Sequence, residues 1–240
     1  MVDTTNNINS GLKSIEERFF KSAISVDCVI FGFDGKDLKV LLIRSYSDEF
    51  KGQWSLVGDL LTPDEDMDSA AYRILRQRTG LDDIYLEQVH AFGRVERHPL
   101  GRVVTVAYYS LININDYNAE TEVAYENSAT WHNVKKVGKL AFDHNEILTA
   151  SLEHLKANLA SRPVGINLLP EKFTLTELQS LYDAILDRPK PLDKRNFRKK
   201  ILSMGILKDL NELQKDVAHR PAKLYSFDRE DYDALLKSAF

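Results

Sequence analysis

One stretch of the chain, Gly58–Leu81, limits the possible fold more than any other. It reads GDLLTPDEDMDSAAYRILRQRTGL. Over Ser69–Thr79 apolar residues recur at helical spacing, with an acidic run before them and Gly80 after them. Acidic residues are favoured at helix N-termini by the helix dipole, and glycine commonly ends a helix. The stretch therefore predicts a loop followed by an amphipathic helix that packs one face against a core.

The same stretch resembles a Nudix box, whose consensus is G-x5-E-x7-R-E-U-x-E-E-x-G-U, with U a bulky aliphatic residue. Glu65 matches the first glutamate, Arg73 the arginine, and Gly80 with Leu81 the end, while Asp59 stands at the glycine position. In Nudix enzymes this helix presents a cluster of carboxylates. Such oxygen ligands suit Mg²⁺, which is usually held by one or two carboxylates together with substrate phosphates.

The three remaining glutamates of the box are replaced by Ile74, Gln77 and Arg78. Isoleucine supplies no ligand, glutamine a neutral one, and arginine a fixed positive charge. We therefore predict no catalytic residue, no metal and no cofactor, and a domain that binds a ligand without hydrolysing it. The alternative is an active pyrophosphatase with displaced metal ligands. Its acidic run would be Asp64, Glu65, Asp66 and Asp68.

Composition agrees with a globular protein: 43% of the 240 residues are hydrophobic and 28% are charged. The single cysteine, Cys28, lies in an apolar run, which predicts a buried core thiol and no disulfide framework. A reducing cytoplasm is therefore the expected location. We expect no signal peptide. No apolar run approaches the roughly 18 residues that a membrane span needs, so no membrane partner is predicted.

The pattern of strands and helices predicts two domains after a polar N-terminal arm. Residues 1–20 are expected to be disordered, residues 21–162 to form the Nudix-like domain, and residues 163–240 a second domain. The Nudix-like domain is predicted as an α/β/α sandwich. Its expected strands are Ala23–Phe33, Leu38–Arg44, Gln53–Val57, Tyr85–Phe92 and Val103–Ile114, and its expected helices are Ser69–Thr79 and Asn145–Leu159.

The C-terminal part has the element order of a winged helix-turn-helix. Thr174–Leu186 is a predicted helix with a capping-box start, and Asp187–Leu192 is a turn with two prolines. A second helix is expected over Asp193–Met204. Two short strands, Ile206–Lys208 and Ala222–Phe227, would then form a hairpin, and the loop Asp216–Lys223 would be the wing.

The second of these helices, DKRNFRKKILSMG, is strongly basic. Arginine can bond guanine bidentately and asparagine can bond adenine, while lysine pairs with phosphates. Between Arg188 and Lys223 there are eleven basic and four acidic residues, against a net charge of −4 for the whole chain. We predict contacts to a double-stranded DNA operator, rather than a merely solvated basic face. The assigned residues are Lys194, Arg195, Asn196, Arg198 and Lys199 on the helix and His219, Arg220 and Lys223 on the wing.

Taken together, these segments resemble the Nudix-related transcriptional regulators of bacteria, in which an inactive Nudix domain is fused to a winged helix. The likeness covers nearly the whole chain after residue 20. It is expected to be nearest to the regulators of L-arabinose utilisation. The resemblance implies a homodimer whose Nudix domains hold the effector and whose winged helices bind a palindromic operator.

The predicted effector is a pentose, most simply L-arabinose, which would weaken DNA binding by a repressor of sugar utilisation. A carboxylate at Asp59 would repel a diphosphate but suits vicinal sugar hydroxyls. The residues assigned to the effector site are Arg44, Trp54, Ser55, Asp59, Arg94, Glu96, His98 and Arg102. His144 is given a structural role. The main alternative is a regulator of NAD metabolism that senses ADP-ribose, and the less favoured one is the active pyrophosphatase.

Overall fold

The strand β1 (Ala23–Phe33) lies at the centre of a mixed sheet, and all of it beyond its first two residues is buried. It pairs in parallel with β6 (Val103–Asn113) along its whole length. Its two ends pair antiparallel with different strands, β4 (Val57–Leu60) near the start and β2 (Leu38–Arg44) near the end. Burial on both faces explains why β1 reads as a nearly continuous apolar run rather than an alternating one.

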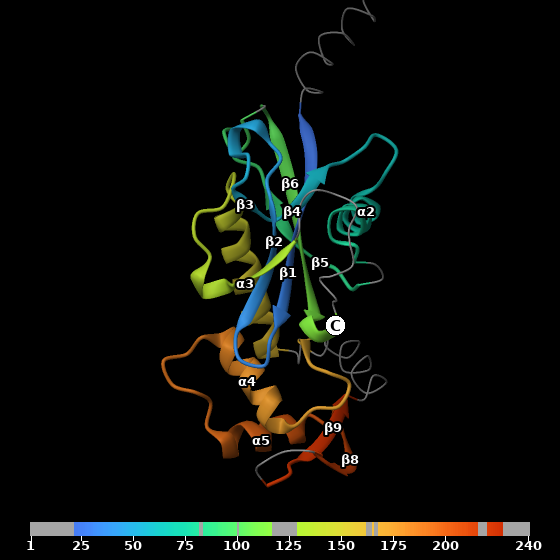
Figure 1. Ribbon diagram of the computed structural model, residues 1–240, viewed down its shortest axis with the longest axis vertical. Helices are drawn as coiled ribbons and strands as arrows, with labels where there is room; N and C mark the ends of the chain where they lie inside the picture. The colour runs from blue at the N-terminus through green and yellow to red at the C-terminus, as the bar shows by residue number, and fades with distance from the viewer. Residues whose placement is uncertain are drawn as a thin grey trace, which may run out of the picture.

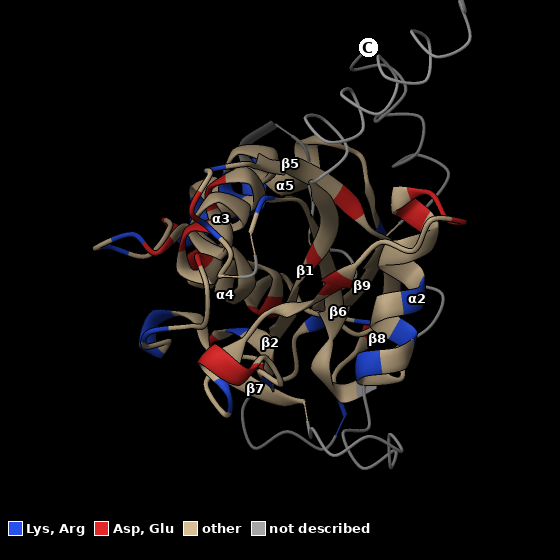
Figure 2. Ribbon diagram, turned by 90° about the horizontal axis from the view of Figure 1, so that it is seen from above, with Lys and Arg blue, Asp and Glu red and all other residues tan. Residues whose placement is uncertain are grey.

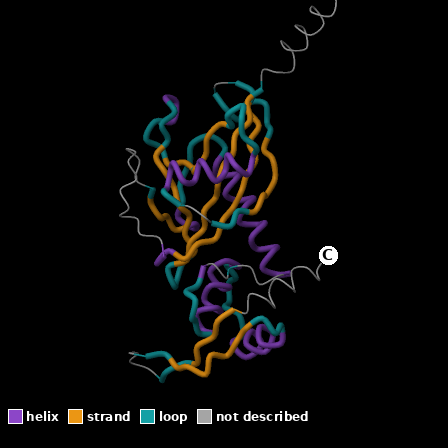
Figure 3. The backbone as a smooth tube through the Cα atoms, turned by 90° about the vertical axis from the view of Figure 1, so that its right-hand side faces the viewer, coloured by secondary structure: helices purple, strands orange, loops and turns teal. Residues whose placement is uncertain are grey.

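The computed structural model describes residues 22–81, 84–99, 101–116, 129–161, 165, 168–215 and 220–227. Figure 1 shows a sheet-containing part above a smaller helical part, and Figure 3 shows the same division from the side. The predicted N-terminal arm and the predicted boundary near residue 162 lie outside the described residues. Within those ranges, no helix is long and apolar enough to cross a membrane.

Within the described ranges the sheet has seven strands, in the order β3-β2-β1-β6-β5, with β4 beside β1 and β7 beside β2. The strands not yet introduced are β3 (Trp54–Ser55), β5 (Glu87–Phe92) and β7 (Thr130–Asn133). The predicted strand Gln53–Val57 was wrong as one element. β3 pairs with β2, whereas β4 pairs with β1, so the chain changes partner at Leu56. β7 was missed altogether.

Two helices cover opposite faces of the sheet (Figure 1). Residues such as Val29 and Phe31 face α3 (His144–Ser161), whereas Cys28 and Ile30 face α2 (Met67–Thr79), as the alternation of a strand requires. This is the predicted α/β/α sandwich. The Cys28 thiol is fully buried, as predicted, and burial raises its pKa far above the usual value.

The lower part has the predicted helix, turn, helix and hairpin. Its elements are α4 (Leu175–Leu186), α5 (Lys194–Ser203), β8 (Leu207–Leu213) and β9 (Lys223–Phe227). The predicted capping box is present, because Thr174 Oγ1 accepts from the backbone N–H of Glu177 and the Glu177 carboxylate accepts from that of Thr174. A bridge between Phe173 and Tyr225 ties the start of α4 to the hairpin.

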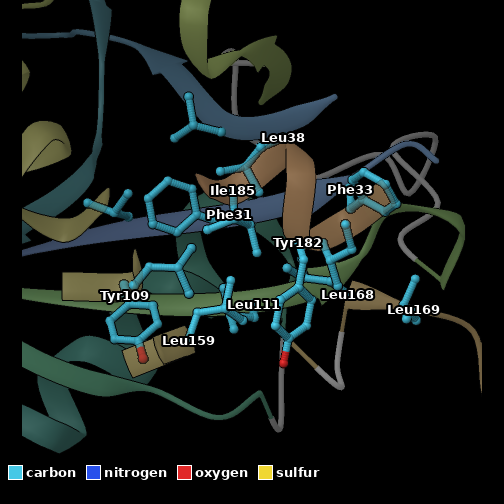
Figure 4. Close-up of a cluster of buried hydrophobic side chains, with 14 of the residues drawn as sticks. Phe31, Phe33, Leu38, Tyr109, Leu111, Leu159, Leu168, Leu169, Tyr182 and Ile185 are labelled. Atoms are coloured by element: carbon cyan, nitrogen blue, oxygen red, sulfur yellow. The ribbon is translucent and has the colours of Figure 1, made fainter. Parts of the chain in front are cut away.

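The two parts share one hydrophobic core, which Figure 4 shows in close-up. Phe31, Phe33 and Leu38 extend from the sheet, and Leu159 extends from the C-terminal half of α3. They belong to the same buried cluster as residues of the lower part. Those residues are Leu168, Leu169, Leu178, Leu181, Tyr182 and Ile185. The winged helix is therefore packed against the sandwich, and α3 supplies core residues to both.

Candidate functional site

The box helix α2 is held at both ends by the local chemistry that its sequence predicts. Asp66 is the N-cap and accepts a hydrogen bond from the backbone N–H of Ser69 at 2.7 Å. Gly80 ends the helix at φ +71°, where glycine carries no steric penalty. Between them, Ile74 is fully buried beneath the helix. The position of one consensus glutamate thus faces the core and offers no oxygen to a metal.

Of the four consensus glutamate positions, two carry an oxygen-bearing side chain, Glu65 and Gln77. Arg73 donates hydrogen bonds to both. Its guanidinium donates to the two oxygens of Glu65 at 2.8 and 2.6 Å, and to the Gln77 side chain at 3.2 Å. Hydrogen bonds from Arg73 lower the pKa of the Glu65 carboxyl to about 2. Arg73 also donates to the Leu60 carbonyl at 3.1 Å, which fixes the loop before the helix. Glu65 and Arg73, the two residues that match the box consensus, therefore form an ion pair with each other.

Arg78, where a Nudix enzyme has its last glutamate, forms an ion pair with Asp59. Its guanidinium also lies 4.4 Å from the centroid of the Tyr46 ring, within the range of a cation–π contact. The second Asp59 oxygen accepts from the backbone N–H of Leu60 at 2.8 Å. Both oxygens that we expected to bond sugar hydroxyls are thus engaged, and Arg78 neutralises the charge that we expected to repel a diphosphate.

These residues do not fit a Mg²⁺ ion. The helix offers a buried isoleucine, an amide already bonded to Arg73, and a cation, and Glu65 is held bidentately. Within the described ranges no group of three or more His, Cys, Asp or Glu side chains could hold a metal ion. Figure 2 shows basic residues along α2, which carries Arg73, Arg76 and Arg78, and the last of these replaces a consensus glutamate.

The charged turn between β5 and β6 lines an open hollow of about 420 Å³. The lining residues are Arg94, Val95, Glu96 and Arg97, so two of the predicted effector residues share one cavity. Arg94 reaches across to Glu146 in the first turn of α3, at 2.8 Å. This ion pair is exposed, and such pairs are typically weak.

Arg97 is the centre of a buried polar network beneath that hollow. Its side chain is 2% exposed and donates to both oxygens of Asp143, at 2.9 and 2.8 Å. Asp27 of β1 lies 3.5 Å from the same guanidinium and 3.4 Å from His144 Nε2. A Cβ at Gly58 would lie 2.1 Å from Asp27 Oδ1, so the glycine that precedes Asp59 is needed for close packing.

His144 was expected to cap the helix that follows it, but its ring instead bonds the chain between β3 and β4. Its Nδ1 accepts from the backbone N–H of Leu56 at 3.0 Å, so the proton of the neutral ring is on Nε2, toward Asp27. Burial lowers the pKa of His144, and burial together with the positive charge of Arg97 lowers the pKa of His98. Both rings are therefore neutral near pH 7.

The other predicted effector residues are not among the four that line this hollow. Ser55 is buried with its Oγ 3.1 Å from His144 Nδ1, so it supports the network. Arg44 stacks over the Trp54 ring at 3.6 Å and donates to the Gly52 carbonyl at 2.7 Å. His98 stacks on Phe142. Arg102 donates to the Gly93 carbonyl, which braces the base of the turn. The sequence-based prediction included Arg97 among the loop residues that could recognise a ligand, but it did not include Asp27 or Asp143.

The predicted DNA-contacting residues of α5 are all exposed. Phe197 and Ile201 anchor the helix to the core, and Asp193 caps it by accepting from the backbone N–H of Asn196 at 2.9 Å. The exposed positions of the helix include Lys194, Arg195, Asn196, Arg198 and Lys199. A single surface of one helix thus presents the basic and amide donors that base and phosphate contacts require.

Side chains of α4 fix the turn that leads into α5. Gln179 Nε2 donates to the Leu192 carbonyl at 2.6 Å, and Asp183 Oδ1 accepts from the backbone N–H of Leu192 at 2.8 Å. The rings of Tyr182 and Phe197 meet edge to face, with centroids 5.2 Å apart. These contacts hold α5 in a defined orientation on α4.

The wing is the β8–β9 hairpin, and its predicted DNA contacts differ in their surroundings. Arg220 is exposed, as expected of a phosphate contact. Lys223 already forms an ion pair with Asp209 at 2.7 Å across the hairpin, which raises its pKa. His219 lies outside the described residues.

A Nudix sandwich in which Ile74, Gln77 and Arg78 replace three consensus glutamates, joined to a winged helix with a basic exposed helix, defines a two-domain architecture. The model of the NUDIX domain family matches residues 21–151. That of the NrtR DNA-binding winged helix domain matches residues 165–227. The chain belongs to the family of NrtR-type regulators, which combine these two domains.

The most similar relatives agree over nearly the whole chain. The chain is 35% identical over 214 residues to the ADPR responsive transcriptional repressor NtrR of Acinetobacter baylyi, covering 88% of this chain and 84% of that protein. It resembles Shewanella oneidensis NrtR in complex with a 27mer DNA with a TM-score of 0.76. Identity is 28%, with coverage of 88% and 95%.

The Nudix domain of Shewanella oneidensis NrtR in complex with ADP ribose also matches, with a TM-score of 0.52 and 29% identity. The match covers 58% of this chain and 92% of that one. The predicted affiliation with L-arabinose regulators is not supported by these relatives. The alternative that we kept, an ADP-ribose-responsive regulator, fits them better.

Proposed function

We propose that this protein is a transcriptional repressor that binds double-stranded DNA through α5 and the β8–β9 wing and releases it when its Nudix domain binds ADP-ribose. The observation that carries the proposal is the similarity over both domains to a repressor described as responsive to ADP-ribose. The neutralised Asp59 supports the same effector, because it removes the charge that would disfavour a diphosphate. This replaces the pentose of the sequence-based prediction.

The effector is tested by calorimetry on the full chain, with ADP-ribose and L-arabinose titrated separately. ADP-ribose is expected to bind, and L-arabinose to give no heat. Operator binding is then measured with and without ADP-ribose, since coupling between two ligands is reciprocal and typically ~1–3 kcal/mol. If L-arabinose gives heat of binding and ADP-ribose gives none, the effector is the sugar and the proposed ADP-ribose is wrong.

The DNA-binding part is tested with Arg195→Ala and Arg198→Ala. A residue that reads a base should lose roughly 1–3 kcal/mol and relax specificity at one position. A phosphate contact should instead weaken all sequences alike and lower the salt dependence. Lys51→Ala is the control, because it removes an exposed positive charge in the Nudix domain, outside both α5 and the wing. Unchanged binding in the Arg195/Arg198 double variant would contradict the assignment.

Absence of hydrolysis and a homodimeric state are two further parts of the proposal. The first rests on Ile74, Gln77 and Arg78, and is tested by incubating ADP-ribose with the protein and Mg²⁺ or Mn²⁺. Turnover that Glu65→Gln abolishes would establish an enzyme instead. The second is tested by light scattering of the free protein and of its operator complex.

A further inference from the structure

Ile74, Gln77 and Arg78 replace the carboxylates that hold a metal ion in Nudix enzymes. Another positively charged group is therefore needed to bind the phosphates of the effector. Nudix enzymes resemble this chain at the box, yet their carboxylates hold the cation that pairs with substrate phosphates. Here the same turn of α2 carries a built-in cation. Two further arginines, Arg73 and Arg76, lie on the same helix, and Asp59 and Glu65 are the carboxylates that pair with Arg78 and Arg73. At the position of the last consensus glutamate, an anionic metal ligand is thus replaced by a cation that can attract an anion.

Arg78 is held in place by its neighbours, but most of its N–H donors are not used in hydrogen bonds to the described residues. Within the described ranges, the one hydrogen bond of its side chain goes to Asp59, and Tyr46 lies against the guanidinium. An arginine has several more N–H donors in a planar fork. The Arg78 and Asp59 side chains are 23% and 28% exposed, and Tyr46 is 51% exposed, so the cluster is open to solvent on one side.

Arg73, another arginine of the box, has fewer N–H donors available to a ligand. Its guanidinium bonds Glu65 bidentately, the Gln77 amide and the Leu60 carbonyl. These bonds use the fork that an anion would need. Of Arg73 and Arg78, it is Arg78 that combines a fixed position with donors available to a ligand.

A guanidinium suits this task, because arginine forms parallel charge-assisted hydrogen bonds with phosphate oxygens and stays protonated at every physiological pH. Unlike Mg²⁺, it is not lost by chelation. It also does not activate a water molecule as a metal ion does. The same substitution therefore allows binding of a diphosphate and removes its hydrolysis.

We propose that Arg78 binds the diphosphate of ADP-ribose directly, at the position where the family's enzymes place Mg²⁺, so that effector binding needs no metal. This inference rests on the proposed function, because it takes ADP-ribose as the ligand. Asp59 then acts as the orienting partner of Arg78 and partly offsets its charge.

The test is calorimetry with ADP-ribose in buffer containing EDTA and again in buffer with Mg²⁺. Wild-type affinity should be the same in both. Arg78→Ala should weaken binding on the order of 10- to 100-fold, the loss typical of a charge-assisted hydrogen bond. Arg78→Lys should lie between, because lysine keeps the charge without the fork. Arg76→Ala removes the same charge from the same exposed turn and should change affinity by less than about threefold.

Asp59→Asn gives a result of opposite sign. It leaves the Arg78 charge without its offsetting carboxylate, so ADP-ribose should bind more tightly than to the wild type. A role of Asp59 in bonding the ligand itself would instead weaken binding. Thermal melting of each variant confirms that it is folded, and Arg78→Lys with Asp59→Asn keeps the test decisive if Arg78→Ala does not fold.

The outcomes separate the two proposals. If wild-type protein binds no ADP-ribose under either condition, the proposed function is wrong and the inference falls with it. If it binds ADP-ribose only with Mg²⁺, or if Arg78→Ala and Arg76→Ala bind equally well, the effector stands and the role of Arg78 is overturned.

Discussion

A substitution of Leu181 by alanine tests whether the sandwich and the winged helix unfold as one unit. Leu181 lies on α4, in the lower part, yet it is fully buried in the cluster that contains Phe31 and Leu38 of the sheet. A buried Leu→Ala change costs roughly 2–5 kcal/mol, by lost transfer free energy and by the cavity left behind. For a chain of this size each kcal/mol lowers Tm by roughly 2–4 °C, so we expect a fall on the order of 10 °C.

The assay uses the uneven placement of tryptophan. Both tryptophans, Trp54 and Trp131, lie in the sandwich. Their fluorescence therefore reports on the part that was not mutated, while far-UV circular dichroism reports on all helices. If the core is shared, both signals should shift together in Leu181→Ala. The control is Leu202→Ala, on α5 of the same part but 48% exposed, which should change the free energy of unfolding by less than about 0.5 kcal/mol.

Separate transitions would refute this reasoning. If the tryptophan signal of Leu181→Ala melts at the wild-type temperature while the dichroism shows an earlier step, the winged helix unfolds alone. The continuous cluster would then contribute packing without cooperativity, and the two parts would behave as independent domains.

Three further predictions concern polar contacts. Arg97→Met should lower the free energy of unfolding by roughly 3–5 kcal/mol, because it leaves the buried Asp143 carboxylate unpaired, and adding Asp143→Leu should recover much of that loss in chemical denaturation; a double variant less stable than the single would contradict this. Because burial lowers the pKa of His144, the unfolded chain takes up a proton below pH ~6.5 that the folded chain does not, so stability should fall from pH 7 to pH 5, and less steeply in His144→Asn. Asp183→Ala frees the Leu192 backbone N–H and should weaken operator binding more than Asp183→Asn, measured by electrophoretic mobility shift; equal binding of both variants would show that this contact does not position α5.

Helices and strands whose ends are set by neighbouring residues in the sequence could be predicted. β1 and β2 have the predicted bounds, since apolar residues and a turn at Asp34 define them, and the Asp34 carboxylate indeed accepts from the backbone N–H of Asp37 at 2.7 Å. The capping box at Thr174 and the stop at Gly80 are equally local. β7 was missed because it is a strand only through its pairing with β2.

The site was less predictable, because its partners are far apart in the chain. Arg97 looks like any other charge of a polar turn until Asp143, 46 residues later, is placed beside it. The partner of Asp59 is likewise not the nearby consensus arginine but Arg78, 19 residues along. That pairing reverses the argument that had favoured a neutral sugar, since the argument assumed an isolated carboxylate.

The helix α3 connects the two ends of the molecule physically. Its N-terminal end carries Glu146 and follows Asp143, which pair with Arg94 and Arg97 of the turn that lines the hollow. Its C-terminal half places Leu159 in the core that holds α4. A ligand that draws the turn toward itself therefore acts directly on the first turn of α3. Because packed interiors are dense, a shift of a rigid helix is passed to the elements packed on it rather than absorbed. We therefore expect a ligand that fills the hollow and shifts α3 to change the position of α5, which packs on α4.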